Sequence, residues 1–434
     1  MIEEIYSIYL RSAGVCTDTR KLKENQVFIA LSGPSFNGND FVQTALDAGC
    51  RLAIADDDRP EFAGSERVMI VEDSLIALQQ LARRHRSKLK IPVVALTGSN
   101  GKTTTKELMH AALSMQYNTY ATKGNLNNHI GVPLSLLEIT KDHEIAIIEM
   151  GANHQLEIEE LCNIATPDFG LITNIGLAHL EGFGGEEGVF LGKKELFDHI
   201  IEYEGKLFLN IDDQKVVRAA NGHSDTTYGQ SNEALYCGEP SLENDRLIVE
   251  WKRSDESEMN RIKTQLSGLY NFSNVMAAIT VARYFGVFSK KINQTIANYV
   301  PENHRSQIQE TQKGNTLIID CYNANPSSMN AAIENLGKHP EGKITAILGD
   351  MFELGERTEI EHNGSIRRLT ENGINECILV GKAFAAASES HSNATRFETT
   401  AEAAQFLKSN PIHNATILIK GSRSMKLEEL LELL

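Results

Sequence analysis

One short segment combines the residue types that bind phosphate. Gly98-Ser99-Asn100-Gly101-Lys102-Thr103 follows the apolar run VVAL and precedes the helix-like run TTKELMHAAL. Glycines let backbone N–H groups approach a phosphate, lysine adds charge, and a hydroxyl binds magnesium. The Walker pattern would need Gly in place of Leu96, so this loop is shortened without losing a phosphate ligand. We predict nucleotide binding at these six residues and Thr104; the alternative is an incidental glycine-rich turn.

A carboxylate and an imidazole follow the next strand-like runs. Glu149 ends IAIIEM, and His179 lies just after LITNIG. The carboxyl ends of strands form the sites of open α/β sheets. Glu149 is a suitable ligand for a hard cation. Taken alone, Glu149 could equally cap a helix, but behind a phosphate loop the pair predicts a magnesium site.

Hydrophobic patterning predicts the elements that position these residues. After Pro92, apolar runs such as VVALTG and FGLITNIG alternate with helix-length patterns and predict a mainly parallel sheet. The segment ALYCGEPSLENDRLIVEWKR predicts an antiparallel meander, and NFSNVMAAITVARYFG a buried helix. From His304 onward, NTLIID, KITAILGD, ECILVG and ATILIKG predict a second doubly wound sheet.

The fold class is therefore α/β with three modules, as expected for 434 residues. Residues 1–91 are predicted to form a small N-terminal α/β domain. Residues 92–303 form a central phosphate-loop domain with a mainly parallel sheet, and residues 304–434 a C-terminal Rossmann-like domain.

Composition excludes several classes of protein. The net charge is -16 and no cluster of Lys/Arg makes a local exception to it, which argues against nonspecific nucleic-acid binding. The six cysteines form no C-x-x-C pair, so neither a zinc knuckle nor a disulfide framework is indicated. The start MIEEIYSIYL lacks a basic segment, and no run of about 18 apolar residues occurs. We expect a cytoplasmic protein without a membrane span.

Eight strings, in the same order, resemble the Mur ligase family, the ATP-dependent amide ligases of peptidoglycan precursor synthesis. They are TGSNGKTTTKE, KGNLNNHIGVPLSLL, EMGANHQLEIEEL, NIGLAHLEGFG, YNFSNVMAA, DCYNANPSSM, LGDMFELG and KGSRSMKLEEL. The shortened loop is this family's own form. YNANPSS, GDMFELG and EMGANH resemble the branch that adds D-alanyl-D-alanine to UDP-N-acetylmuramoyl-tripeptide, and the DNPR signature of earlier enzymes in the series does not occur.

The resemblance implies acyl-phosphate chemistry with ATP and two Mg²⁺ ions. Lys102 and the loop amides would hold the β- and γ-phosphates. Thr103 and Glu149 would bind one magnesium, and His179 would contribute to the metal region. Lys193 matches a lysine that the family carbamylates into an anionic metal ligand, which makes Lys102, Lys193 and His179 the expected catalytic residues. Lys194 is adjacent and could be the carbamylated residue instead, and both could simply be solvated lysines that open a helix.

The resemblance also assigns contacts to ATP and the dipeptide. Asn271 and Asn274 are expected near the purine and ribose, although Asn is also common at helix starts. Arg305 matches an interdomain arginine. The run after Asp320 is expected to close over the nucleotide and dipeptide, or to be an Asx-rich turn before a helix. Its contacts are assigned as Asp320 and Asn323 to the nucleotide, and Tyr322 and Asn325 to the dipeptide.

The remaining expected contacts are with the substrates. Thr19, Arg20 and Asn37 would grip the UDP-sugar, and Asn127 and Asn128 would face the muramoyl peptide. Lys420 and Arg423 would bind a phosphate or carboxylate near the dipeptide, or merely end a strand. A monomer is the default expectation. Two alternatives stay open: another ligase of the superfamily, of folylpolyglutamate or cyanophycin type, and a phosphate-loop regulatory ATPase.

Overall fold

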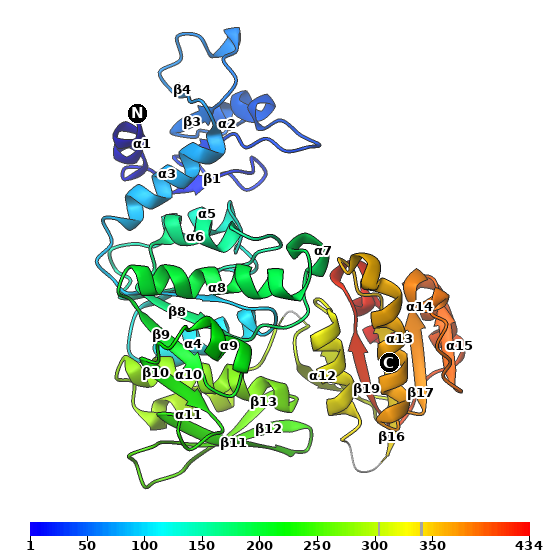
Figure 1. Ribbon diagram of the computed structural model, residues 1–434. Helices are drawn as coiled ribbons and strands as arrows, with labels where there is room; N and C mark the ends of the chain where they lie inside the picture. The colour runs from blue at the N-terminus through cyan, green and yellow to red at the C-terminus, as the bar shows by residue number, and fades with distance from the viewer. Residues whose placement is uncertain (303, 339–341) are drawn as a thin grey trace.

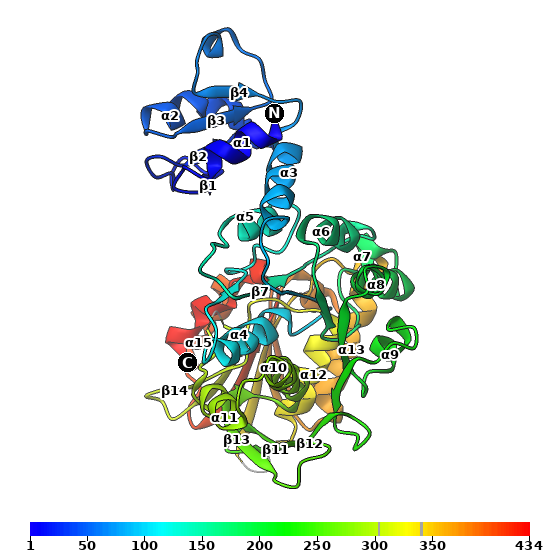
Figure 2. The same cartoon turned by 90° about the vertical axis from the view of Figure 1, so that its left-hand side faces the viewer.

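The computed structural model describes residues 1–302, 304–338 and 342–434, which form three α/β modules (Figure 1). Each module has its own sheet, and the described strands span residues 15–70, 93–267 and 307–420. The N-terminal module projects from one end of the central module, and the C-terminal module lies against its flank (Figures 1 and 2). The predicted fold class is confirmed. Residue 303, at the second predicted boundary, lies outside the described residues.

The N-terminal module has a four-stranded parallel sheet in the order β1-β2-β3-β4. These strands are Val15–Cys16, Val27–Ile29, Leu52–Ala55 and Val68–Ile70, and the helices are α1 (Ile2–Tyr9), α2 (Val42–Asp47) and α3 (Ser74–Arg86). Helix α3 leads into the central module (Figure 2). There the Arg86 guanidinium donates to the Ala165 carbonyl over 2.9 Å and pairs with Asp168 over 2.9 Å. These bonds fix the end of the helix against the central module.

The central module has a nine-stranded sheet in the order β13-β12-β11-β10-β9-β8-β5-β7-β6. Its strands are β5 (Val93–Thr97), β6 (Thr119–Ala121), β7 (Ile145–Glu149), β8 (Phe169–Ile172), β9 (Lys206–Asn210), β10 (Thr226–Gly229), β11 (Tyr236–Glu243), β12 (Arg246–Arg253) and β13 (Asn260–Ser267). The pairs from β6 to β11 are parallel. Strands β11 and β12 form the predicted antiparallel meander, and β13, which was not predicted, extends it. Successive residues of β5 are buried on opposite faces, which explains its unbroken apolar run.

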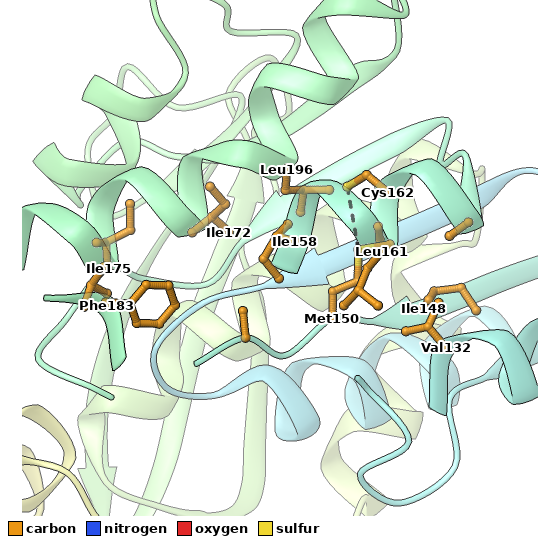
Figure 3. Close-up of a cluster of buried hydrophobic side chains, with 14 of the residues drawn as sticks. Val132, Ile148, Met150, Ile158, Leu161, Cys162, Ile172, Ile175, Phe183 and Leu196 are labelled. Carbon is orange, nitrogen blue, oxygen red and sulfur yellow. Dashed lines mark hydrogen bonds between the residues drawn. The ribbon is translucent and has the colours of Figure 1, made fainter. Parts of the chain in front are cut away.

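Helices cover both faces of this sheet. One layer contains α4 (Lys102–Leu113), α10 (Phe272–Tyr284) and α11 (Ser289–Asn298); the other contains α5 (Gly131–Leu137), α6 (Glu157–Ala165), α7 (Leu180–Phe183) and α8 (Glu186–Glu202), with α9 (Gln214–Ala219) beside β9. Helix α10 is the predicted buried helix. Figure 3 shows part of the apolar core, in which Ile158 of α6 and Leu196 of α8 belong to the same cluster as Ile148 of β7 and Ile172 of β8. This core fixes the positions at which β7 and β8 end, next to the candidate site.

The C-terminal module has a six-stranded sheet in the order β14-β15-β19-β16-β17-β18. Its strands are β14 (Gln307–Glu310), β15 (Thr316–Asp320), β16 (Lys343–Gly349), β17 (Glu376–Val380), β18 (Ala394–Phe397) and β19 (Ala415–Lys420), and its α-helices are α12 (Pro326–Leu336), α13 (Thr358–Glu371), α14 (Lys382–Ala386) and α15 (Thr400–Ser409). The four predicted strands, β15, β16, β17 and β19, pair in parallel. Across the described parts of the chain, no helix has both the length and the apolar composition needed to cross a membrane.

Candidate active site

The phosphate loop, residues Gly98 to Thr103, connects β5 to α4, the strand–loop–helix context that was predicted. Gly98 has φ +146°, and a Cβ there would lie 2.0 Å from the Thr173 Oγ1. Gly101 has φ +78°, and a Cβ there would lie 2.4 Å from the Asn274 Oδ1. Both the backbone conformation and the close neighbours therefore require glycine. The loop ends at the N-terminus of α4, where unpaired N–H groups favour an anion.

Two residues that follow β8 form hydrogen bonds with the phosphate loop. Asn100 donates its backbone N–H to the Asn174 Oδ1 over 3.0 Å, and the Asn174 Nδ2 donates to the Asn100 carbonyl over 3.0 Å. The Thr173 hydroxyl donates to the same carbonyl over 2.6 Å. The sequence patterns above do not assign Thr173 or Asn174 a role. The signal that could have identified them is their position directly after a buried strand that neighbours β5.

Lys102 lies at the start of α4 with its side chain folded back over the loop. Its Nζ donates to the Gly98 carbonyl over 2.6 Å. Burial lowers the pKa of the Lys102 amine, and the charge of Glu149 acts in the opposite direction. An anion placed at the loop would favour the ammonium form and draw it away from the carbonyl.

Glu149 and Thr103 come together at the carboxyl end of β7, as predicted for a magnesium site. Glu149 is 1% exposed, and its Oε1 accepts from the Thr103 hydroxyl over 3.3 Å and from the Asn127 Nδ2 over 2.8 Å. Its Oε2 has no hydrogen-bond partner and lies 3.5 Å from the Lys106 Nζ. A hydroxyl beside a buried carboxylate with an unsatisfied oxygen fits a hard cation.

In the part of the chain that the structure describes, no three His, Cys, Asp or Glu side chains form a group that could hold a metal. Magnesium bound here would therefore take its further ligands from a nucleotide phosphate and water, as is usual for this ion. Thr103 and Glu149 would hold it, and it would supply charge neutralisation at the phosphate.

His179 precedes the short helix α7 and contacts the C-terminal module. Its Nδ1 is hydrogen-bonded to the carboxylate of Glu353, and its backbone has φ +51°. Burial lowers the pKa of the His179 ring, and the charge of Lys102 acts in the same direction. The imidazole is thus close to the phosphate loop, although its nearest partner here is a carboxylate of another module.

The two adjacent lysines of α8 lie in different environments. Lys193 is 1% exposed, donates to the Ala152 carbonyl over 3.2 Å and lies 4.9 Å from the centre of the Phe183 ring. Burial, followed by the charge of Lys102, brings the pKa of the Lys193 amine well below its ordinary value. The side chain of Lys194 is 25% exposed and pairs with Asp198 on the same helix. Of these two lysines, Lys193 is the one that is buried and close to Lys102 of the phosphate loop.

The loop after β15 brings the C-terminal module to the same place. Asp320 pairs with Lys420 over 2.5 Å, and the Lys420 Nζ is 3.4 Å from the Asn323 carbonyl. The Arg305 guanidinium lies 3.7 Å from the centre of the Tyr322 ring, and that of Arg423 5.3 Å from it. A paired carboxylate and two cations on an aromatic ring thus face the phosphate loop.

Two asparagines of the helix α10 region are hydrogen-bonded to α4, to each other and to the end of β13 rather than projecting freely. The Asn274 Oδ1 accepts from the Thr105 hydroxyl over 3.1 Å, and its Nδ2 donates to the Asn271 Oδ1 over 2.9 Å. The Asn271 Nδ2 donates to the Ser267 carbonyl over 2.7 Å. Both also line the cavity beside the loop.

One cavity of about 950 Å³, hereafter the loop cavity, collects most of the predicted residues from the central and C-terminal modules. The predicted residues that line it are Ser99, Asn100, Gly101, Lys102, Thr103, Thr104, Asn127, Asn128, Glu149, His179, Asn271, Asn274, Arg305, Asp320, Tyr322, Asn323, Asn325, Lys420 and Arg423. Gly98 and Lys193 do not line it.

A second cavity of about 1710 Å³, hereafter the basic cavity, lies between the N-terminal and central modules. Its lining contains six lysines and three carboxylates, although the chain as a whole has a net charge of -16. The predicted residues Thr19, Arg20 and Asn37 do not line it. Arg20 is exposed and pairs with Asp18 over 2.8 Å, while the Asn37 Oδ1 caps a short helix by accepting from the Asn39 N–H over 3.0 Å. The structure does not bring these three together with the phosphate loop.

A phosphate loop that faces a Rossmann-like module across one cavity defines an α/β enzyme of the phosphate-loop class. The chain belongs to the Mur ligase family. Its residues 11–86 match the model described as Mur ligase family, catalytic domain. Residues 96–282 match the Mur ligase middle domain, and residues 304–423 match the Mur ligase, glutamate ligase domain.

Individual relatives are similar over nearly the whole chain. The UDP-N-acetylmuramoyl-tripeptide–D-alanyl-D-alanine ligase of Bacillus subtilis (strain 168) is 35% identical, with 96% of this chain and 92% of the relative covered. The crystal structure of MurF from Acinetobacter baumannii has a TM-score of 0.87 at 32% identity, covering 96% of this chain and 92% of that one. MurF ligase from Thermotoga maritima in complex with ADP also has a TM-score of 0.87, at 28% identity, covering 98% and 97%.

Proposed function

We propose that this chain joins D-alanyl-D-alanine to UDP-N-acetylmuramoyl-tripeptide at the expense of ATP, in the cytoplasmic synthesis of peptidoglycan precursors. The observation that carries the proposal is the loop cavity, in which Lys102 and Glu149 of the central module face Tyr322 and Asn325 of the C-terminal module. The full-length similarity to ligases of that name supports the choice of substrates.

The first step forms an acyl phosphate. A carboxylate oxygen of the tripeptide attacks the γ-phosphorus of ATP, and the bond from that phosphorus to the bridging oxygen of ADP breaks. Two anions must approach each other, so fixed positive charge lowers the barrier. Lys102 and the N–H groups at the start of α4 hold the phosphates. Thr103 and Glu149 are the residues that would hold magnesium, which supplies further neutralising charge.

The second step forms the amide. The amine nitrogen of D-alanyl-D-alanine attacks the acyl carbon, phosphate leaves, and the nitrogen loses a proton. The dipeptide must be held on the side of the loop cavity formed by the C-terminal module. Arg423 and Lys420 would bind its carboxylate or the departing phosphate, and Arg305, Asp320 and Asn323 would contact the nucleotide together with Asn271 and Asn274. Tyr322 and Asn325 would orient the dipeptide.

The basic cavity is the route that we assign to the UDP-muramoyl substrate. Its excess of lysines in an acidic chain suits a ligand with a diphosphate and several carboxylates. The segment from Thr122 to His129 separates the two cavities, with residues on the basic cavity followed by Asn127 and Asn128 on the loop cavity. The peptide end of the substrate would cross this segment, while Thr19, Arg20 and Asn37 remain predicted contacts of the UDP end.

Lys193 is the residue that we assign to carbamylation, with His179 completing the region of a second magnesium ion. Burial and a lowered pKa favour the neutral amine, which is the form that reacts with carbon dioxide. The amine nitrogen bonds to the carbon of carbon dioxide and releases a proton, leaving an anionic oxygen ligand. The exposed ion pair of Lys194 supports the choice of Lys193 over its neighbour.

We assign a different binding role to each of the three predicted domains. Residues 1–91 would bind the UDP-sugar, residues 92–303 ATP, and residues 304–434 ATP and the dipeptide. We propose a monomer as the default state. A ligase of folylpolyglutamate or cyanophycin type would use another acceptor, and a regulatory ATPase would use none.

The test is phosphate release from ATP and magnesium by purified protein, with and without each of the two peptide substrates. We expect release that needs both substrates, with a UDP-muramoyl-pentapeptide product identified by mass. Release that ignores both substrates would indicate the regulatory ATPase, and release with another acceptor would indicate the other ligases.

A further inference from the structure

Lys106 is a buried lysine of the basic cavity to which the assigned mechanism gives no individual role. It lies one helical turn after Thr103 on α4 and is 3% exposed. Its Nζ donates to the Gly124 carbonyl over 3.1 Å and lies 3.5 Å from the Glu149 Oε2. The ammonium therefore faces the one carboxylate oxygen of Glu149 that no hydrogen bond satisfies.

The pair stands where the two cavities approach each other. Lys106 lines the basic cavity, and Glu149 lines the loop cavity. A carboxylate that is 1% exposed is unstable without compensating charge. Lys102 also lies within electrostatic reach of Glu149, but its hydrogen bonds go to carbonyls of the phosphate loop. Among the described residues, Lys106 is thus the cation in salt-bridge contact with Glu149.

We propose that Lys106 is a positioning residue that compensates the charge of Glu149 while no metal is bound. Its ammonium group pairs with the Glu149 Oε2, while the Glu149 Oε1 accepts hydrogen bonds from Thr103 and Asn127. Without nucleotide, free magnesium then gains little binding free energy at Glu149, because Lys106 already neutralises the carboxylate. Magnesium that arrives with a nucleotide gains phosphate oxygens as additional ligands. Lys106 thereby couples the entry of metal to the entry of ATP, an inference that rests on the proposed function.

The experiment measures apparent thermal midpoints without nucleotide, in EDTA and in excess magnesium chloride. Lys106→Met leaves Glu149 buried and unpaired, so we expect its midpoint in EDTA to fall by about 5 °C or more. Magnesium should restore at least half of that loss in Lys106→Met and should shift the wild type little. Lys106→Arg should behave more like the wild type, because it keeps the charge.

The double variant Lys106→Met with Glu149→Gln separates charge compensation from packing. The double variant removes both charges, so its thermal midpoint should fall by less than the sum of the falls in the two single variants. Magnesium should not change the midpoint of the double variant. Lys123→Met is the matched control: Lys123 lines the same basic cavity but pairs with Glu138 at the surface. It should show neither the loss nor the response to magnesium.

Equal magnesium shifts in the wild type and in Lys106→Met would overturn the proposal, as would additive losses in the double variant. If Lys106→Met does not fold, the double variant should still fold; its failure would mean that Lys106 acts by packing and would also overturn the proposal. Ligation by the wild type is measured separately. Its absence would overturn the proposed function alone, because the magnesium response uses neither peptide substrate.

Discussion

The side-chain amide of Asn325, in the C-terminal module, donates through Nδ2 to the Oδ1 of Asn100 in the phosphate loop over 2.8 Å. The same side chain caps α12, because its Oδ1 accepts from the Ser328 N–H over 2.9 Å. One residue thus sets the start of a helix in one module and contacts the nucleotide loop of another. The orientation of α12 is therefore tied to the conformation of the loop.

Asn325→Asp separates these two roles. Aspartate is as good an N-cap as asparagine, so α12 should keep its stability. The carboxylate cannot donate to Asn100, and it adds negative charge beside the site of the phosphates. We expect kcat/KM for ATP to fall about 10-fold or more, because a hydrogen bond between neutral amides contributes about 0.5–1.5 kcal/mol and the added charge also repels the phosphates. Steady-state phosphate release would measure the change.

The control for Asn325→Asp is Ser328→Ala, which removes the hydroxyl that accepts from the Asn325 N–H over 3.1 Å but leaves the contact with Asn100. It should lower the thermal midpoint while kcat/KM changes little. An Asn325→Asp enzyme with wild-type kcat/KM would show that the contact between the modules has no part in turnover.

Lys102→Ala removes the charge that we assign to the phosphates. The hydrogen bonds of its side chain go to carbonyls of the phosphate loop, so the fold should persist. Ligation should fall at least about 100-fold, the usual cost of removing a group that stabilises transition-state charge. Lys194→Ala, on the exposed side of α8, is the control and should keep its activity. Full activity in Lys102→Ala would refute the assignment of the loop.

The sheets were predictable where strands are buried on both faces. The runs VVAL of β5 and ILI of β19 are continuously apolar because helices cover both sides of these strands. Strands β14 (QIQE) and β18 (ATRF) were not predicted. They lie at the two edges of their sheet and are only partly buried, so selection for apolar residues is weak there.

The candidate site was predictable where its residues are neighbours in sequence or follow a strand directly. The phosphate loop and Glu149 are of this kind. The roles of Asn174 and Lys106 depend on which side chains meet across strands and helices, and no local pattern reports that. For Arg20 a local pattern is present but the structure does not test it. The motif predicts a ligand contact, whereas the described partner of Arg20 is Asp18, two residues away. Its role with the UDP-sugar stays a prediction.

Lys193→Ala tests the carbamate. The variant should lose most ligase activity, because it removes the nitrogen that carries the anionic ligand. Bicarbonate should not restore the activity, whereas a short carboxylic acid should restore part of it by placing a carboxylate in the vacated space. Lys194→Ala should need no rescue. Wild-type rates in Lys193→Ala, with loss in Lys194→Ala, would move the carbamate to Lys194.

His85 predicts how stability depends on pH where the N-terminal module meets the central one. Its ring is buried on α3, and its Nε2 is 2.8 Å from the Ile139 carbonyl. Burial lowers the pKa of His85 below its ordinary value of 6.5, an effect that the bond to Ile139 only partly opposes. Below about pH 6.5 the unfolded chain therefore binds more protons at this residue than the folded chain does.

The contribution of His85 to stability is consequently complete above pH 6.5 and declines as the pH falls toward the lowered pKa of the folded state. His85→Gln can still donate to Ile139 but does not titrate. Between about pH 7.5 and about pH 5.5, the urea midpoint should fall more in the wild type than in His85→Gln. The difference between the two proteins isolates this residue from the other histidines. Equal falls would show that the His85 ring is protonated as readily in the folded chain as in the unfolded one.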